Sequence, residues 1–269
     1  MGLFDYEFMR NAFAATTIVA IVAGAIGYFL VLRGETFAGH ALSHVGFSGA
    51  TGAVLLGISP LVGLVAFTIA AALGISLVGE KAHRDVAIGL VLTVSLGLGL
   101  LFLHFYTAYA GMATNLLFGN VLGISQQTVW VLLGMAVVTL AGLAFISRPL
   151  LFASLQPELA EARGIATGRL SALFMVIVAL ATAQAIQIVG VLLVFALMVA
   201  PAATALRLTH RVATGVALAI GFAVGIAWIS LLLAYFTDWP TSFWITALGG
   251  LAYALSRLPA WLSSRRTTA

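Results

Sequence analysis

Two histidines near the start of the chain are the side chains most able to do chemistry. His40 and His44 lie in the stretch Gly39-His40-Ala41-Leu42-Ser43-His44. On a helix, a spacing of four residues puts both imidazoles on one face, where they can share a metal ion. Two polar rings in an apolar segment are costly unless they have a partner or a function. The spacing also fits two hydrogen-bonded histidines near a helix end, so both interpretations stay open.

The composition indicates that a membrane surrounds these histidines. Of 269 residues, 62% are hydrophobic and 7% are charged, whereas a soluble domain has about 25% charged residues. The apolar runs are nearly continuous and do not alternate, which favours helical spans over a β-barrel. The first run lacks a cleavage site and is predicted to be a mature span. The absence of cysteine excludes disulfides and thiolate metal sites. We therefore predict an all-α polytopic membrane protein.

The apolar runs predict about eight or nine crossings, since a span needs roughly 20 residues. The long run 170–208 is divided at Gly190 into a hairpin, and 111–124 is too short to cross, so we expect it to be re-entrant or interfacial. The predicted spans are 12–32, 37–58, 60–79, 86–105, 127–147, 170–189, 190–208, 213–236 and 240–257.

The basic residues predict the orientation of the chain. If the polar loop 148–169 is cytoplasmic, all of the 12 Lys and Arg residues except Arg10 lie on the inside. The positive-inside rule then puts the N-terminus outside and the C-terminus in the cytoplasm. The net charge of +4 is explained by this distribution and does not indicate nucleic-acid binding.

The polar side chains within the spans are few. No Asp or Glu falls in a predicted span, which weighs against a carrier coupled to protons or sodium. Gln184 and Gln187 lie three residues apart on one helical face. Hydrogen bonding between helices is the favoured role for this pair, and a place on a substrate path is the alternative.

The predicted cytoplasmic loop contains a short helix. Pro157 suits the first helical position, Glu158 and Glu161 suit the positive N-terminal end, and Arg163 suits the C-terminal end. Gly164 is a natural stop. Such a helix is a connector on the membrane surface or a docking element for a partner. The chain has no phosphate-binding loop, so ATP-driven transport needs a second chain that holds the nucleotide.

Four motifs in the same order identify a family resemblance. They are Ala38-Gly39-His40-Ala41-Leu42-Ser43-His44; Leu151-Phe152-Ala153-Ser154 with Pro157-Glu158-Leu159-Ala160; Val189-Gly190-Val191-Leu192-Leu193-Val194-Phe195-Ala196-Leu197-Met198-Val199-Ala200-Pro201-Ala202-Ala203-Thr204-Ala205; and Thr241-Ser242-Phe243-Trp244. With these motifs, nearly the whole chain resembles the membrane permease subunit of zinc/manganese-type ABC importers.

The resemblance implies one permease domain, 1–269, in a bacterial cytoplasmic membrane, with the substrate path between two copies of the chain. It also implies cytoplasmic ATPase subunits and an extracytoplasmic metal-binding protein, so the permease itself is not expected to be an enzyme. The loop helix would dock on the ATPase through Pro157, Glu158, Ala160, Glu161, Arg163 and Gly164.

The residue at position 40 bears on which metal is carried. Many members of the family have an acidic residue where this chain has His40. A nitrogen-rich site suits zinc and an oxygen-rich site suits manganese, so zinc is the expected cargo and manganese the alternative, with no permanently bound cofactor. An ATP-independent metal carrier is a further alternative. A remote one is an intramembrane serine protease, because Gly46-Phe47-Ser48-Gly49 resembles the nucleophile motif of rhomboid proteases.

Overall fold

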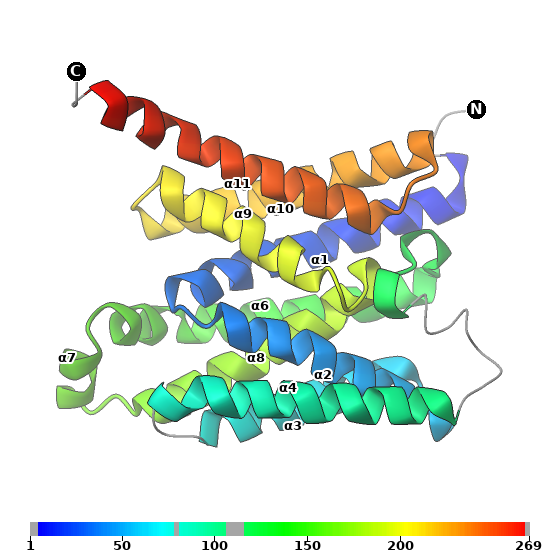
Figure 1. Ribbon diagram of the computed structural model, residues 1–269, viewed down its shortest axis with the longest axis horizontal. Helices are drawn as coiled ribbons and strands as arrows, with labels where there is room; N and C mark the ends of the chain where they lie inside the picture. Colours follow the sequence, from blue (N-terminus) through cyan, green and yellow to red (C-terminus); the bar gives the residue numbers. More distant parts are fainter. Residues whose placement is uncertain (1–4, 78–80, 106–115, 267–269) are drawn as a thin grey trace.

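The protein is a bundle of helices that run roughly along one long axis (Figure 1). The computed structural model describes residues 5–77, 81–105 and 116–266, with side chains described outside 81–84 and 258–266. The helices are α1 (Glu7–Leu32), α2 (Thr36–Leu55), α3 (Pro60–Leu77), α4 (Lys81–His104), the 3₁₀ helix η2 (Val121–Gly123), α6 (Gln126–Leu155), α7 (Pro157–Ala162), α8 (Thr167–Val189), α9 (Val194–Leu208), α10 (Val212–Thr237) and α11 (Thr241–Arg266).

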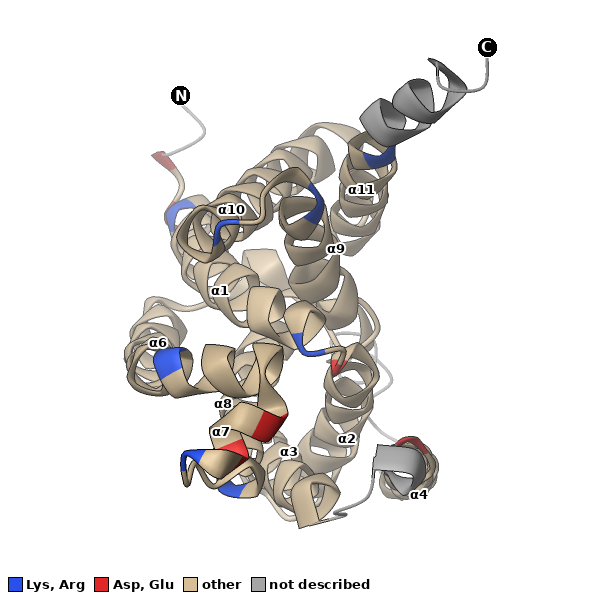
Figure 2. Cartoon of the chain, turned by 90° about the vertical axis from the view of Figure 1, so that its left-hand side faces the viewer, with Lys and Arg blue, Asp and Glu red and all other residues tan. Residues whose placement is uncertain are grey.

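Helices α1 and α8 form the centre of the bundle. In each, 72% of the most apolar 18-residue window is buried inside the protein. Helices α9, α10 and α11 pack together on one side, and α2, α3 and α4 pack on the other (Figures 1 and 2). Small residues allow the close approach: a Cβ at Gly27 of α1 would overlap the Met198 carbonyl of α9.

The small residues of α2 let neighbouring helices approach it closely. A Cβ at Gly49 of α2 would overlap the backbone of Gly63 on α3, and the reverse is also true. One turn earlier, a Cβ at Gly46 would press on the Ile186 side chain of α8 and on Leu64 of α3. Helix α2 is therefore packed inside the protein.

Six of the described helical segments are long and apolar enough to cross a membrane. They are α1, α3, residues 85–104 of α4, α6, α8 and α10. Helix α9 is apolar but has only 15 residues. Each predicted span overlaps one helix, and most ends agree to within five residues, but α6 runs on from 147 to Leu155 and α11 from 257 to Arg266. The total of eight or nine crossings stays a prediction.

The predicted boundaries of the polar loop were wrong. Helix α6 continues through Pro149 as far as Leu155, and α8 already begins at Thr167. Pro149 lies inside α6, and neighbouring helices can stabilise a membrane helix that contains proline. Leu150, the next residue, is fully buried. The loop that was assigned to 148–169 therefore consists of α7 and the few residues on either side of it.

The predicted break at Gly190 is confirmed. Gly190 ends α8 with a φ of 79°. After it, Val191 and Leu192 donate backbone hydrogen bonds to the carbonyls of Leu116 and Leu117, at 3.0 and 3.3 Å. The two arms do not form a closely packed hairpin, because α9 packs mainly against α1, α10 and α11. A turn in which the Leu193 N–H donates to the Gly190 carbonyl at 3.3 Å and the pairing with Leu116 and Leu117 together set the path of this segment.

The segment 111–124 does not cross the bundle in its described part. Residues 111–115 lie outside the described residues. In the remainder, the Asn120 side chain accepts the Gly123 backbone N–H at 3.1 Å and caps η2. Asn11 of α1 donates to the Ile124 carbonyl at 3.3 Å. The contact from Asn11 ties the segment to α1 near the end of the bundle where the chain begins.

The two ends of the bundle differ in charge. Helix α7 and the C-terminus lie at one end, and the N-terminus lies at the other (Figure 1). Among the arginines whose side chains are described, Arg10 in the first turn of α1 is alone at the N-terminal end. The others lie on segments that meet at the α7 end, as the view onto that end shows (Figure 2). The lopsided distribution expected from the sequence is thus present.

Gly190→Ala is expected to destabilise the protein. The new Cβ would overlap the backbone of Leu117 and Gly119, and the left-handed φ disfavours any L side chain. Together these effects cost roughly 2–4 kcal/mol, measured as a lower midpoint of thermal unfolding in detergent. Gly134→Ala on α6, where a Cβ meets nothing within 4 Å, is the control. Equal midpoints for the two variants would contradict the prediction.

Candidate functional site

The two predicted metal-binding histidines lie together on one face of α2. The centroids of the His40 and His44 rings are 4.8 Å apart, with the ring planes at 86°. The His40 ring also lies 5.2 Å from the ring of Phe195 in the first turn of α9. Both histidines are half-buried. Helix geometry thus brings the pair together as expected, and α9 places one aromatic ring, that of Phe195, beside His40.

The polar atoms of the pair are not all satisfied within the chain. Nδ1 of His40 is buried and has no hydrogen-bond partner in the structure, so the interpretation as a fully hydrogen-bonded core histidine does not hold for this residue. Among the described residues, no group of three or more His, Cys, Asp or Glu side chains could hold a metal ion. Within the described residues, the pair therefore brings together two imidazoles, fewer than the four ligands of a closed zinc site.

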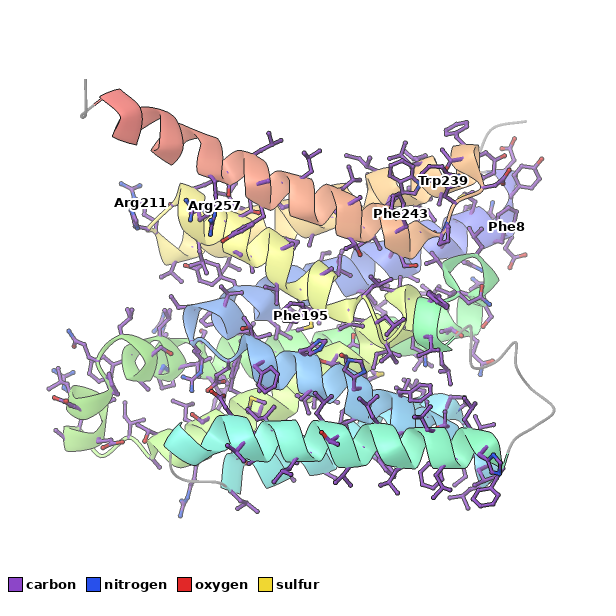
Figure 3. The ribbon with its side chains drawn as sticks, in the orientation of Figure 1. Phe8, Phe195, Arg211, Trp239, Phe243 and Arg257 are labelled. Carbon is purple, nitrogen blue, oxygen red and sulfur yellow. The ribbon has the colours of Figure 1, made fainter. Side chains whose placement is uncertain are left out.

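The histidine pair lies deep in the bundle. His40 is only in the second turn of α2, which begins near the α7 end. Its neighbour Phe195 nevertheless lies near the middle of the bundle's length (Figure 3). This is possible because the chain breaks at Gly190 and α9 starts inside the bundle. Because of this break, the His40 ring lies next to the first turn of α9 and not beside the middle of a long helix.

The two glutamines have different environments. Gln184 is fully buried, and its Nε2 donates to Thr139 Oγ1 of α6 at 2.9 Å and to the Leu180 carbonyl at 3.1 Å. This is the interhelical bonding that was the favoured interpretation. Gln187 is half-buried and lines a cavity of about 390 Å³ together with Asn120 and other residues, near the end of the bundle opposite α7.

The predicted loop helix is present as α7. Pro157 is its first residue, Ala160 is fully buried, and the helix stops at Ala162, just before Gly164 with its φ of 79°. The Arg163 guanidinium lies 5.3 Å from the centre of the Phe152 ring. These contacts hold α7 against the end of α6.

The outer side of α7 is open. The helix projects from one end of the bundle (Figure 1). Glu158 is exposed, and so are the apolar residues Leu155 and Leu159, with 65% and 44% of their surface accessible to solvent. Glu161 accepts a hydrogen bond from the Thr167 hydroxyl at 2.9 Å. The helix thus presents acidic and apolar groups side by side while its own position is fixed by internal contacts.

Ser48, the candidate protease nucleophile, has a structural role. It is fully buried, and its hydroxyl donates to the backbone carbonyl of Ser95 on α4. A nucleophilic serine instead needs a general base as its acceptor. The Gly46-Phe47-Ser48-Gly49 motif is accounted for by packing between helices.

One charged residue has a larger role than its position in the sequence predicts. From the sequence, Arg33 is only one of the basic residues that indicate topology. In the structure it is paired with Glu35, with both side chains 11% exposed. The available signal was a pair of opposite charges in a very short connection between two apolar helices.

Comparisons with known proteins agree with this architecture. The family model described as ABC 3 transport family matches residues 5–258. The chain is 34% identical over 236 residues to the manganese transport system membrane protein MntC of Listeria monocytogenes, covering 87% of this chain and 84% of that protein. It is 33% identical over 259 residues to MntC of Halalkalibacterium halodurans, covering 94% and 88%.

A solved structure has the same fold. PsaBC from Streptococcus pneumoniae, determined in complex with Fab, superposes with a TM-score of 0.86 at 27% identity, covering 96% of this chain and 93% of that one. The family match spans almost all of the residues that form the bundle. This chain therefore belongs to the ABC 3 transport family and is a membrane permease subunit of a metal ABC importer, a multi-pass protein of a bacterial inner membrane.

Proposed function

We propose that this chain is the permease of a manganese importer in which His40 and His44 contact the ion during passage. The observation that carries the proposal is the pair of imidazoles with an unpartnered nitrogen, deep in a permease whose relatives are named as manganese transport proteins. A transported ion needs ligands that replace part of its hydration without holding it tightly. Two ligands from one chain suit such a transient contact.

The expectation of zinc is not supported by the relatives, which are named for manganese. It rested on the nitrogen-rich character of His40 and His44. Ligand type alone is a weak guide, because imidazole sites bind several divalent metals and selectivity depends on geometry and metal supply. Oxygen ligands from water or from a second protein can complete a manganese site around two imidazoles.

We further propose that the α7 end faces the cytoplasm and that the permease works as a pair of copies. The gathering of basic side chains at the α7 end supports this orientation through the positive-inside rule. A second copy would raise the number of available imidazoles from two to four. The extracytoplasmic end would then receive manganese from a metal-binding protein.

We assign α7 to docking on a cytoplasmic ATPase. The helix projects from the bundle and exposes Glu158 beside Leu155 and Leu159. An ATPase groove with apolar walls and a basic rim would complement this surface. An ATP-independent metal carrier, the alternative function, has no use for such a helix, so the effect of α7 variants on ATP hydrolysis separates the two functions.

The double variant His40→Ala/His44→Ala should lose manganese uptake. Even the loss of an outer partner of a metal ligand costs about 10- to 100-fold in metal affinity, so uptake into proteoliposomes should fall by about tenfold or more. The complex with its ATPase should still assemble, because both side chains are only half-buried. His210→Ala, in the exposed connection between α9 and α10, is the control. Unchanged uptake by the double variant would remove the histidines from the path.

His40→Asp should shift the preference towards manganese. The substitution replaces one nitrogen ligand by carboxylate oxygens, which suit manganese better than zinc. We expect the ratio of manganese to zinc uptake, measured with both ions present, to rise above that of the native protein. An unchanged or lower ratio would contradict selection of the ion by the ligand type at this position.

Glu158→Lys should weaken docking on the ATPase. Reversing an exposed charge on α7 changes the docking surface while leaving the packing of buried Ala160 intact. Co-purification of the ATPase and transport-dependent ATP hydrolysis should both fall. Glu7→Lys, an exposed reversal in the first turn of α1 at the opposite end, should change neither. Normal co-purification and coupling in Glu158→Lys would refute the docking assignment.

A further inference from the structure

A single guanidinium joins three parts of the bundle near α7. Arg33 donates through Nη1 to Ser154 Oγ at 3.0 Å and through Nη2 to Ser171 Oγ at 2.7 Å. Nη2 also pairs with Glu35 Oε1 at 3.1 Å. The centre of the group lies 5.3 Å from the Phe174 ring centroid. All four contacts are made by the side chain of Arg33, which lies in the short connection between α1 and α2.

The partners of Arg33 lie on both sides of α7 and at the start of α2. Ser154 is in the last turn of α6, three residues before Pro157, and Ser171 is in the second turn of α8, which follows α7. Glu35 immediately precedes α2 and lies five residues before His40. The guanidinium thus connects three places: the end of α6 and the start of α8, which flank the proposed ATPase-docking helix α7, and the start of α2, which carries the histidines.

The chemistry of this contact resists rearrangement. Arg33 and Glu35 are each 11% exposed, and a buried charge without its partner is strongly disfavoured. The planar fork of arginine can bond two hydroxyls and a carboxylate in fixed directions, which the single ammonium of lysine cannot do. A displacement of Ser154 and Ser171 must therefore either drag Arg33 along or break charge-assisted hydrogen bonds.

The bundle around the contact is not closely packed. A cavity of about 510 Å³ lies beside it and is lined by Arg33, Glu35, Ser154 and Ser171, with Asp85 of α4 and Glu161 of α7 on its other walls. Space between α2 and α7 leaves room for relative movement there. It also makes the polar contacts of Arg33 a principal physical link across this part of the molecule.

We propose that Arg33 is a positioning residue that transmits movement of α7 to the start of α2 and so to the histidine pair. When the ATPase shifts α7, Ser154 and Ser171 move with it, and the guanidinium carries the displacement to Glu35 and to α2. The proposal rests on the function proposed above, in which α7 docks on an ATPase and His40 contacts the ion.

The test uses the complete transporter, with ATPase and metal-binding protein, in proteoliposomes. Ser154→Ala/Ser171→Ala removes two hydrogen bonds without leaving a buried charge unpaired, and Arg33→Gln removes the cation. Coupling between sites is commonly worth about 5- to 150-fold, so manganese taken up per ATP hydrolysed should fall about fivefold or more in both variants. Ser147→Ala, whose hydroxyl bonds within α6 to the Ala144 carbonyl, should keep the native ratio.

The ratio separates transmission from simple stabilisation. A merely structural role would lower ATP hydrolysis and uptake together, in proportion to the amount of folded protein. That result from Ser154→Ala/Ser171→Ala would overturn the proposal, even if the Arg33→Gln variant did not fold. A native ratio in this serine variant would overturn it as well. If the native transporter coupled ATP hydrolysis to uptake of neither manganese nor zinc, the proposed function would fail first. Arg33→Lys should give an intermediate ratio, because the charge remains while the fork is lost.

Discussion

Every polar group inside this bundle needs a partner within the protein, because surrounding hydrocarbon offers none. Helices satisfy the backbone, and most buried hydroxyls follow by bonding to carbonyls. Ser48 donates to Ser95 across α2 and α4, and Gln184 donates to Thr139 across α8 and α6. A few buried side-chain atoms of the described residues have no hydrogen-bond partner, among them Thr16 Oγ1, Ser230 Oγ and Nδ1 of His40. Of these atoms, Nδ1 of His40 belongs to a ring that lies next to a second imidazole, and this pairing is what supports the proposed contact with the ion.

Close contacts between backbones determine which face of α2 remains for chemistry. Gly49 meets Gly63 of α3, and Gly46 lies against Ile186 of α8. These glycines allow α2 to pack closely on α3 and α8, while the His40 ring lies beside Phe195 of α9. If α8 continued without the break at Gly190, no helix would begin beside the histidines. The short α9 and the glycine-lined packing of α2 are therefore two parts of one arrangement around the histidines.

Charge is concentrated where the bundle meets the proposed ATPase. The supports of α7 converge on Arg33, and the exposed side of α7 combines Glu158 with Leu155 and Leu159. Glu35, which immediately precedes α2, lies only five residues before His40 in the chain. A permease in which docking, transmission and ion contact lie this close needs little internal movement to connect them, provided that the polar link between α7 and α2 stays intact.

The sequence by itself determined the helical class, the position of most helices, the shared face of His40 and His44 and the short helix at Pro157, because these depend on local hydropathy, spacing and capping. It did not determine that α6 runs through Pro149, that α9 leaves α8 to pack on α1, α10 and α11, or that Arg33 contacts Ser154 and Ser171. Those features join residues far apart in the chain. They were decided by the tertiary structure, because only the packed bundle sets which backbones approach closely and which buried charges find partners.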